Sequence, residues 1–178
     1  MLRFCLAAFL ACAAAAPLAA APPAAAATPF NPQIDYASFR QLAIEVEPYR
    51  RSRLLDWSAF AAAAAEPGVL ILDARSAAQF AEGHIEGAVN LPLPEFSEEA
   101  LAEILGPQDR PILIYCNNNF RNDVRPVMLK SGRVALNIST FIHLVAYGYR
   151  NVRELNDVVD LDDPAIRWVR GPAVPSTG

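Results

Sequence analysis

The chain has 178 residues, of which 53% are hydrophobic and 19% are charged, and its formal net charge is −4. This length is enough for one domain with a proper core, without disulfide or metal support. The balance of apolar and charged residues excludes a wholly disordered chain. Nucleic acids and anionic membrane surfaces require clustered positive charge, and the acidic chain has no basic run, so neither is an expected partner.

Residues 1–27 have the layout of a secretory signal peptide. A basic start precedes an uncharged apolar stretch at 4–16, and small residues continue to position 27. We expect cleavage after Ala20 or Ala27, which predicts a periplasmic or secreted protein with no stable membrane insertion after processing. A retained membrane anchor and a lipid anchor at Cys12 are the alternatives, and the prolines in the segment disfavour the first.

The rest of the chain divides into an N-terminal extension at 28–52, a domain at 53–170 and a short tail at 171–178. The extension is helix-like from about residue 36 to residue 47. The region after residue 155 is rich in proline and aspartate, and we expect it to be irregular.

Short apolar runs alternate with amphipathic segments along the domain. The runs at 69–72 and 111–115 are typical of strands that are buried on both faces, and 88–91 and 152–155 predict two further strands. Capping residues and helical periodicity predict helices at about 56–65, 76–83, 97–106 and 138–148. This alternation predicts an α/β fold with a mostly parallel sheet.

Cys116 directly follows the second buried strand. Cys5 and Cys12 would leave with the signal peptide, so Cys116 would be the only cysteine of the mature protein. One cysteine can form neither an internal disulfide nor a multi-thiolate zinc site, and we find no metal-binding constellation. Cys116 is therefore either an inert buried residue or a thiol retained for chemistry.

The residues after Cys116 are candidates for binding a substrate. In parallel α/β sheets ligands bind at the carboxyl ends of strands, where Cys116 and Asp73 both lie. A curled loop can direct backbone N–H groups at a thiolate, and asparagine tolerates the left-handed angles that curling requires. A closing arginine would add a fixed cation for an anionic substrate. The predicted substrate-binding residues are Asn117, Asn118, Asn119, Phe120 and Arg121. The alternative is an Asn-rich turn that encloses a buried thiol.

Three stretches of the chain resemble the rhodanese family of sulfurtransferases. The first runs from Leu72-Asp73-Ala74-Arg75 through Gln79-Phe80 to Gly83-His84-Ile85-Glu86-Gly87-Ala88-Val89-Asn90-Leu91-Pro92. The second is the strand that leads into Cys116, and the third is Gly148-Tyr149-Arg150-Asn151-Val152. The resemblance covers about residues 53–155, which corresponds to one rhodanese domain.

The resemblance implies a rhodanese-like sheet of about five mostly parallel strands, flanked by helices on both faces. It also implies that Cys116 carries a persulfide, without a cofactor, and that Asp73 and Arg75 support the active-site loops. Arg121 follows Cys116 by five residues, which is similar to the loop of sulfur-transferring members. The related phosphatase branch has a longer loop.

Two features differ from the family pattern. Asn119 stands near a position that is often glycine, and residues 122–134 are inserted before the next helix. We expect this insertion to displace the helix N-terminus from the sulfur, so that Arg121, Arg125 or Lys130 would supply positive charge instead. We also expect the insertion to be a mobile flap that selects the acceptor.

The main hypothesis is an exported sulfurtransferase that moves sulfur from thiosulfate or a related anionic donor to a thiol or cyanide. The alternatives are a binding or sensing module without turnover and a phosphatase- or arsenate-type oxyanion enzyme. A Cys–His protease would have to use His84 or His143 as its base, because the chain has no other histidine. The sequence does not favour that alternative.

Overall fold

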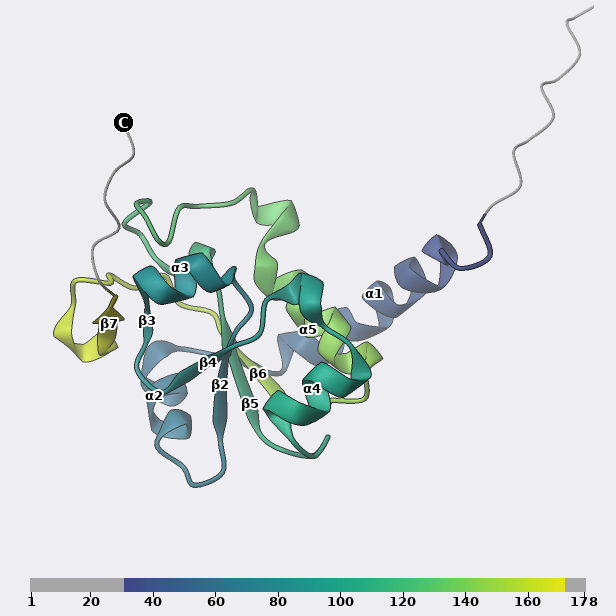
Figure 1. The fold of residues 1–178 in the computed structure, drawn as a ribbon, viewed down its shortest axis with the longest axis horizontal. Helices are drawn as coiled ribbons and strands as arrows, with labels where there is room; N and C mark the ends of the chain where they lie inside the picture. Colours follow the sequence, from purple (N-terminus) through teal and green to yellow (C-terminus); the bar gives the residue numbers. More distant parts are fainter. Residues whose placement is uncertain (1–30, 172–178) are drawn as a thin grey trace, which may run out of the picture. The chain divides into compact units, whose positions relative to one another are not determined.

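Five short strands form one parallel sheet in the computed structural model, which describes residues 31–171. The strands are β1 (Leu54–Leu55), β2 (Leu70–Asp73), β4 (Ala88–Asn90), β5 (Ile112–Tyr115) and β6 (Val152–Leu155). Their order is β1-β6-β5-β2-β4, and every pairing between them is parallel (Figure 1). The α/β fold and the five-stranded parallel sheet are confirmed. The expectations for the signal peptide at 1–27 and for most of the tail lie outside the described residues.

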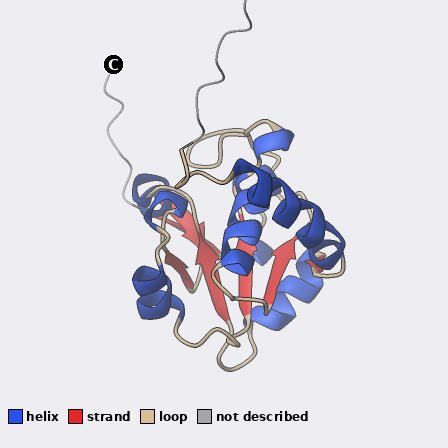
Figure 2. Ribbon diagram, turned by 90° about the vertical axis from the view of Figure 1, so that its right-hand side faces the viewer, coloured by secondary structure: helices blue, strands red, loops and turns tan. Residues whose placement is uncertain are grey.

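Helices cover both faces of this sheet (Figure 2). They are α1 (Tyr36–Arg51), α2 (Trp57–Ala64), α3 (Ala77–Glu82), α4 (Glu98–Leu105) and α5 (Leu136–Ala146). Asp56, Ser76 and Ser97 each accept a hydrogen bond from a backbone N–H in the first turn of the helix that follows. Within residues 31–171, none of the helices has the length and apolar character needed to cross a membrane.

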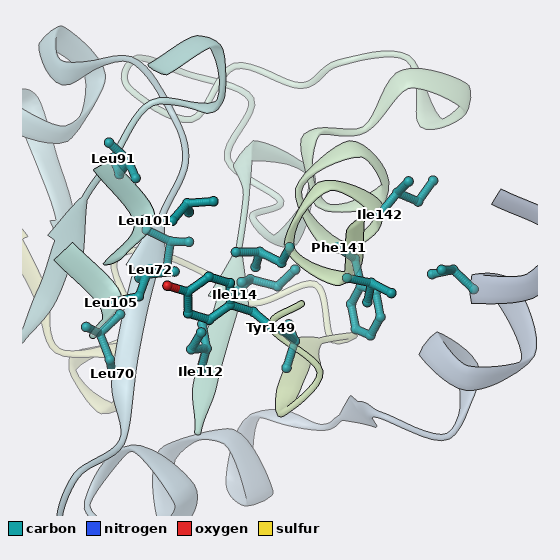
Figure 3. Close-up of a cluster of buried hydrophobic side chains, with 14 residues drawn as sticks. Leu70, Leu72, Leu91, Leu101, Leu105, Ile112, Ile114, Phe141, Ile142 and Tyr149 are labelled. Atoms are coloured by element: carbon teal, nitrogen blue, oxygen red, sulfur yellow. The ribbon is translucent and has the colours of Figure 1, made fainter. Parts of the chain in front are cut away.

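Two apolar clusters fill the space between the sheet and its covering layers. One contains leucines and isoleucines of β2 and β5 packed against α4, α5 and Val46 of α1 (Figure 3). The other joins Phe60 of α2 to Tyr115, Phe120 and Ile166. The continuous apolar runs at 70–72 and 112–115 are explained by burial on both sides.

The N-terminal extension forms a helix longer than the sequence indicates. Helix α1 continues through Pro48 to Arg51, although proline removes one hydrogen bond of the helix. Val46 is buried before the proline, and the Tyr49 ring meets the edge of Phe141 of α5 after it. Contacts on both sides of Pro48 therefore attach α1 to the domain.

The region after residue 155 is more ordered than expected. Leu161 and Ile166 are buried in the second cluster. Beyond them, β7 (Trp168–Arg170) pairs antiparallel with β3 (Gly83–Ile85). Neither strand was expected, because segments of three residues show no clear alternation of apolar and polar side chains.

The insertion at 122–134 is packed onto the domain through Val127, which differs from the mobile flap expected from the sequence. Val127 is fully buried in the second cluster. Arg75 Nη1 donates a hydrogen bond to the Pro126 carbonyl at 3.2 Å, and Asp123 Oδ1 accepts one from Leu129 N at 2.8 Å. This packing is hard to predict from the sequence, because Val127 is the one residue of the insertion that belongs to an apolar cluster.

Val127 and Val124 offer a matched test of this packing, since Val127 is 0% exposed and Val124 is 51% exposed. We expect Val127→Ala to lower the free energy of unfolding by about 1.5–3 kcal/mol, because it removes buried methyl groups and leaves a cavity. Val124→Ala should change it by less than about 0.5 kcal/mol. Denaturant unfolding measures both, and equal effects would contradict the packing of the insertion.

Candidate functional site

Cys116 lies where β5 ends, at the carboxyl edge of the sheet. Its backbone is extended, and a short 3-10 turn, Asn117–Asn119, follows it. The thiol is free, and the residue is only 1% exposed. The nucleophile expected from sequence is therefore a buried thiol at the edge where parallel sheets bind ligands.

Burial raises the pKa of the Cys116 thiol, and the charge of Glu154 raises it further. Backbone N–H groups of Asn137, Asn118 and Leu136 face the sulfur and act in the opposite direction. Loss of water around the sulfur outweighs these amides. The N–H groups that a curled loop was expected to direct at a thiolate therefore do not lower the pKa of Cys116 below that of an ordinary cysteine in this structure.

Helix α5 begins beside the sulfur. Leu136 and Asn137 are its first two residues, and both direct their N–H groups at Cys116. The expectation that the insertion displaces this helix is therefore wrong. The inserted residues 122–134 form a loop whose end brings the chain back to the site. The N-terminus of α5 therefore contributes to the site despite the insertion.

The side chains of Asn117 and Asn118 fasten the insertion beside the site. Asn117 Nδ2 donates to the Met128 carbonyl at 2.9 Å, and Asn118 Nδ2 donates to the Lys130 carbonyl at 2.7 Å. Lys130 N donates back to Asn118 Oδ1 at 3.2 Å. These asparagines do not adopt left-handed backbone angles. Their side-chain hydrogen bonds explain their presence better than backbone tolerance does.

Asn119 holds together the segments that surround the sulfur. Its Oδ1 accepts hydrogen bonds from Cys116 N at 2.9 Å and from Asn137 Nδ2 at 3.0 Å. Its Nδ2 donates to the carbonyls of Leu155 at 2.8 Å and Asp157 at 3.1 Å. Asn119 thus links the end of β5 to the start of α5 and the end of β6.

Phe120 and Arg121 point away from the sulfur. Phe120 is fully buried against Tyr115 and Trp168, so it is a core residue. Arg121 N donates to the Val159 carbonyl at 3.0 Å. The structure therefore does not bring these two residues into the predicted substrate-binding group, because the chain after Asn119 pairs with residue 159 and does not curl back.

Arg121 lines a different pocket, of about 660 Å³. Acidic residues surround it there, and its charge helps to lower the pKa of Asp160, after hydrogen bonds from Asn122 and Asp162. Arg121 consequently faces carboxylates and is not placed to receive an anionic substrate at Cys116.

A pocket of about 480 Å³ adjoins the turn that follows Cys116, and Cys116 itself is not one of its lining residues. Asn117, the next residue in the chain, and Leu136, whose amide faces the sulfur, both line it. The full lining is Ala74, Arg75, Ser76, Gln79, Pro92, Pro94, Glu95, Asn117, Lys130, Val134 and Leu136. Arg75 and Lys130 provide the positive charges of this wall.

Asp73 and Arg75 form a fully buried ion pair beneath the pocket. Arg75 Nη2 donates to Asp73 Oδ2 at 2.6 Å, and the Tyr115 hydroxyl donates to the same oxygen at 2.6 Å. Arg75 also donates to the carbonyls of Gly83 and Pro126. The Arg75 guanidinium is thus paired with Asp73. Lys130, the other cation of the pocket lining, has no ion-pair partner among residues 31–171.

Neither histidine contacts Cys116 in the described part of the chain. The His84 Nδ1 lies 2.8 Å from the Phe80 carbonyl, and its ring stacks on Phe80. The His143 Nδ1 lies 2.7 Å from the Ser139 carbonyl. Residues 31–171 also contain no cluster of three or more potential metal ligands. A Cys–His protease site gains no support from this geometry.

Sequence reasoning missed several residues around the sulfur. Glu154 lies at an inward position of strand β6. A charged residue at such a position is a sign of a buried charge that the sequence did offer. Its partner Arg50, 104 positions earlier, could not be read from spacing. The pocket positions Gln79, Pro92 and Pro94 lie within or next to the family signature but carry no chemical signal of their own.

The chain belongs to the rhodanese-like domain family, because the model of that family matches residues 56–157. This match includes the strand before Cys116, the turn after it and helix α5. It excludes helix α1 and strand β7. No curated protein matches the chain.

Solved structures with similar folds include a rhodanese from E. coli, with 24% identity over 58% of this chain and 99% of that chain, at a TM-score of 0.38. A rhodanese-like domain of an Anabaena protein has 21% identity over 58% of this chain and 67% of that chain, at a TM-score of 0.41. A single-domain sulfurtransferase from Saccharomyces cerevisiae has 11% identity over 60% of this chain and 85% of that chain, at a TM-score of 0.41.

Lys130 and Arg121 can be compared directly as candidate anion-attracting residues. We expect Lys130→Met to slow the reaction of Cys116 with iodoacetate, an anion, about threefold relative to neutral iodoacetamide. Arg121→Met should leave this ratio unchanged, since Arg121 lines the other pocket. Mass spectrometry of the peptide that contains Cys116 separates it from Cys5 and Cys12. The reverse result would assign the role to Arg121.

Proposed function

We propose that this protein is a sulfurtransferase in which Cys116 carries the transferred sulfur. The observation that supports this most directly is the arrangement around the thiol. Three backbone N–H groups face the sulfur, and a pocket with a lysine adjoins the turn that follows Cys116. Such a site can hold negative charge on sulfur and can admit a small anion.

In the first half of the reaction, the Cys116 thiolate attacks the outer sulfur of thiosulfate. The sulfur–sulfur bond of the donor breaks, and sulfite leaves with the bonding electron pair. A Cys–S–S⁻ persulfide remains on the protein. The amides of Asn118, Leu136 and Asn137 can stabilise the anionic sulfur before and after this step.

In the second half, cyanide or an acceptor thiolate attacks the outer sulfur of the persulfide. Thiocyanate or a new persulfide leaves, and the Cys116 thiolate is regenerated. Atoms and electrons balance without an external oxidant or reductant, so the reaction requires no cofactor. Because burial raises the pKa of Cys116, the rate of the first half should increase with pH through the neutral range.

A binding or sensing module is the second candidate function. It is favoured by the near-complete burial of Cys116 and by the raised pKa of its thiol, both of which disfavour a reactive thiolate. An oxyanion enzyme of the phosphatase or arsenate type is less well supported, because Arg121 does not close the loop around the sulfur.

We expect incubation with thiosulfate to add one sulfur atom to Cys116, and cyanide or a small thiol to remove it. Intact-mass measurement followed by analysis of the peptide that contains Cys116 detects the change. Cys116→Ser should abolish loading while leaving the unfolding transition intact, because the two side chains are nearly isosteric. Arg121→Met is the matched control and should load normally.

The absence of added sulfur with thiosulfate and with a neutral organic polysulfide would contradict the enzyme proposal. The binding-module proposal would then take its place. Hydrolysis of a phosphate ester by the wild-type protein, lost in Cys116→Ser, would favour the oxyanion enzyme.

We further propose that the protein is exported to the periplasm or secreted. Support comes from the sequence of residues 1–27 alone, in which small residues and no charged stop follow the apolar stretch. The folded domain would then work without the disulfide support common in exported proteins, since Cys116 would be its only cysteine.

Export predicts a mature N-terminus near residue 21 or residue 28. Expression in a bacterial host with a functional secretion system, followed by fractionation and N-terminal sequencing, measures it. Deletion of residues 4–16 should retain the protein in the cytoplasm. Recovery of the full-length chain from the cytosol alone would contradict this proposal.

A further inference from the structure

Strand β6 carries a buried carboxylate on the same side of the sheet as Cys116. Glu154 pairs in parallel register with Ile114 of β5, and Cys116 follows Ile114 by two residues in extended backbone. Residues two apart in extended chain face the same side, and paired residues on neighbouring strands share that side. Strand geometry therefore places the Glu154 and Cys116 backbones about 8 Å apart.

Helix α1 supplies the counter-ion of this carboxylate. Arg50 Nε donates to Glu154 Oε2 at 2.5 Å, and a second guanidinium nitrogen donates to Glu154 Oε1. The Glu154 side chain is 4% exposed, and that of Arg50 is 27% exposed. Removal of one partner from such a pair leaves an uncompensated charge near the sulfur.

Few other charges face Cys116. On the β2 side, Asp73 and Arg75 neutralise each other in a buried pair. Lys130 lines the pocket beside the sulfur. On α5, the groups nearest the sulfur are backbone amides, and His143 on the same helix is directed to the Ser139 carbonyl. Among residues 31–171, the Arg50–Glu154 pair thus places a charged group of β6 on the Cys116 side of the sheet.

We propose that Arg50 is a positioning residue of the Cys116 site, because it offsets part of the negative charge that Glu154 places beneath the sulfur. Helix α1 thereby becomes an electrostatic part of a site whose family match begins only at residue 56. The link to catalysis depends on the proposed function, in which the thiolate is the reacting form. The effect on the thiol itself does not depend on sulfur transfer.

Charge-changing variants test this proposal through the pH profile of Cys116 alkylation by iodoacetamide. Arg50→Met keeps an unbranched apolar stem but removes the cation, so the apparent pKa of Cys116 should rise. Alkylation at pH 7 should then be about three- to tenfold slower. Glu154→Gln should lower the apparent pKa and accelerate alkylation by a similar factor, and the double variant should react at nearly the wild-type rate.

Arg51→Met is the matched control, because Arg51 is the next residue of α1 and pairs with Glu47 on the surface, with 74% of its side chain exposed. It should leave the profile unchanged. Far-ultraviolet circular dichroism and denaturant unfolding identify variants that fail to fold, and Glu154→Gln with the double variant carries the test if Arg50→Met does not fold.

Opposite shifts for Arg50→Met and Glu154→Gln, cancelled in the double variant, support the electrostatic role. Shifts of the same sign, or none in folded variants, would overturn it, because a merely structural pair has no reason to move the thiol in two directions. Sulfur loading is measured separately. A protein that never loads sulfur but shows the opposite shifts fails the proposed function and retains this inference.

Discussion

The Asn119 side chain is the interaction on which the arrangement of the site depends. Its Oδ1 accepts from the backbone N–H of Cys116 and from Asn137 at the start of α5, and its Nδ2 donates to one carbonyl at the end of β6 and one just after it. A buried polar group without a partner is costly, so these segments are held at fixed distances from one another. Glycine, common near this position in the family, could provide none of these bonds. Here the hydrogen bonds of the Asn119 side chain fix the positions of these segments instead. They help to keep the first amides of α5 close to the sulfur, despite the thirteen inserted residues at 122–134.

Two opposing effects act on the thiol within this frame. Amides at a helix N-terminus favour the thiolate, whereas exclusion of water favours the neutral thiol. In this structure burial has the larger effect, and the buried Glu154 acts in the same direction. Lys130 adds a positive charge to the wall of the neighbouring pocket. The pKa of the thiol therefore depends on burial and on a charge, that of Glu154, which lies outside the Cys116 turn.

The sequence predicts the parts of this protein that have local causes. The runs at 70–72 and 112–115 must be buried because they are apolar on both faces, and Asp56, Ser76 and Ser97 cap helices through contacts within three residues. Cys116 could be placed at a strand end for the same reason. The direction of Arg121 could not, since it follows from the pairing of Phe120 with Val159, 39 residues later. Nor could the packing of Val127, because the side chains of its apolar cluster come from segments far from the insertion in the sequence.

Segments outside the family match complete the site from two sides. From the N-terminal side, α1 brings Arg50 to Glu154 beneath the sulfur. From the C-terminal side, β7 brings Trp168 against Phe120, with the Arg75 guanidinium 5.4 Å from the Trp168 ring. A side chain at Gly83, the first residue of β3, would come within 2.5 Å of the Trp168 indole nitrogen, so the paired strand leaves room for that ring only because Gly83 has none. Arg75 in turn holds Asp73 and the insertion. The matched region contains Cys116 and the amides that face it, whereas the partner of Glu154 and the ring packed against Phe120 come from these two flanking segments.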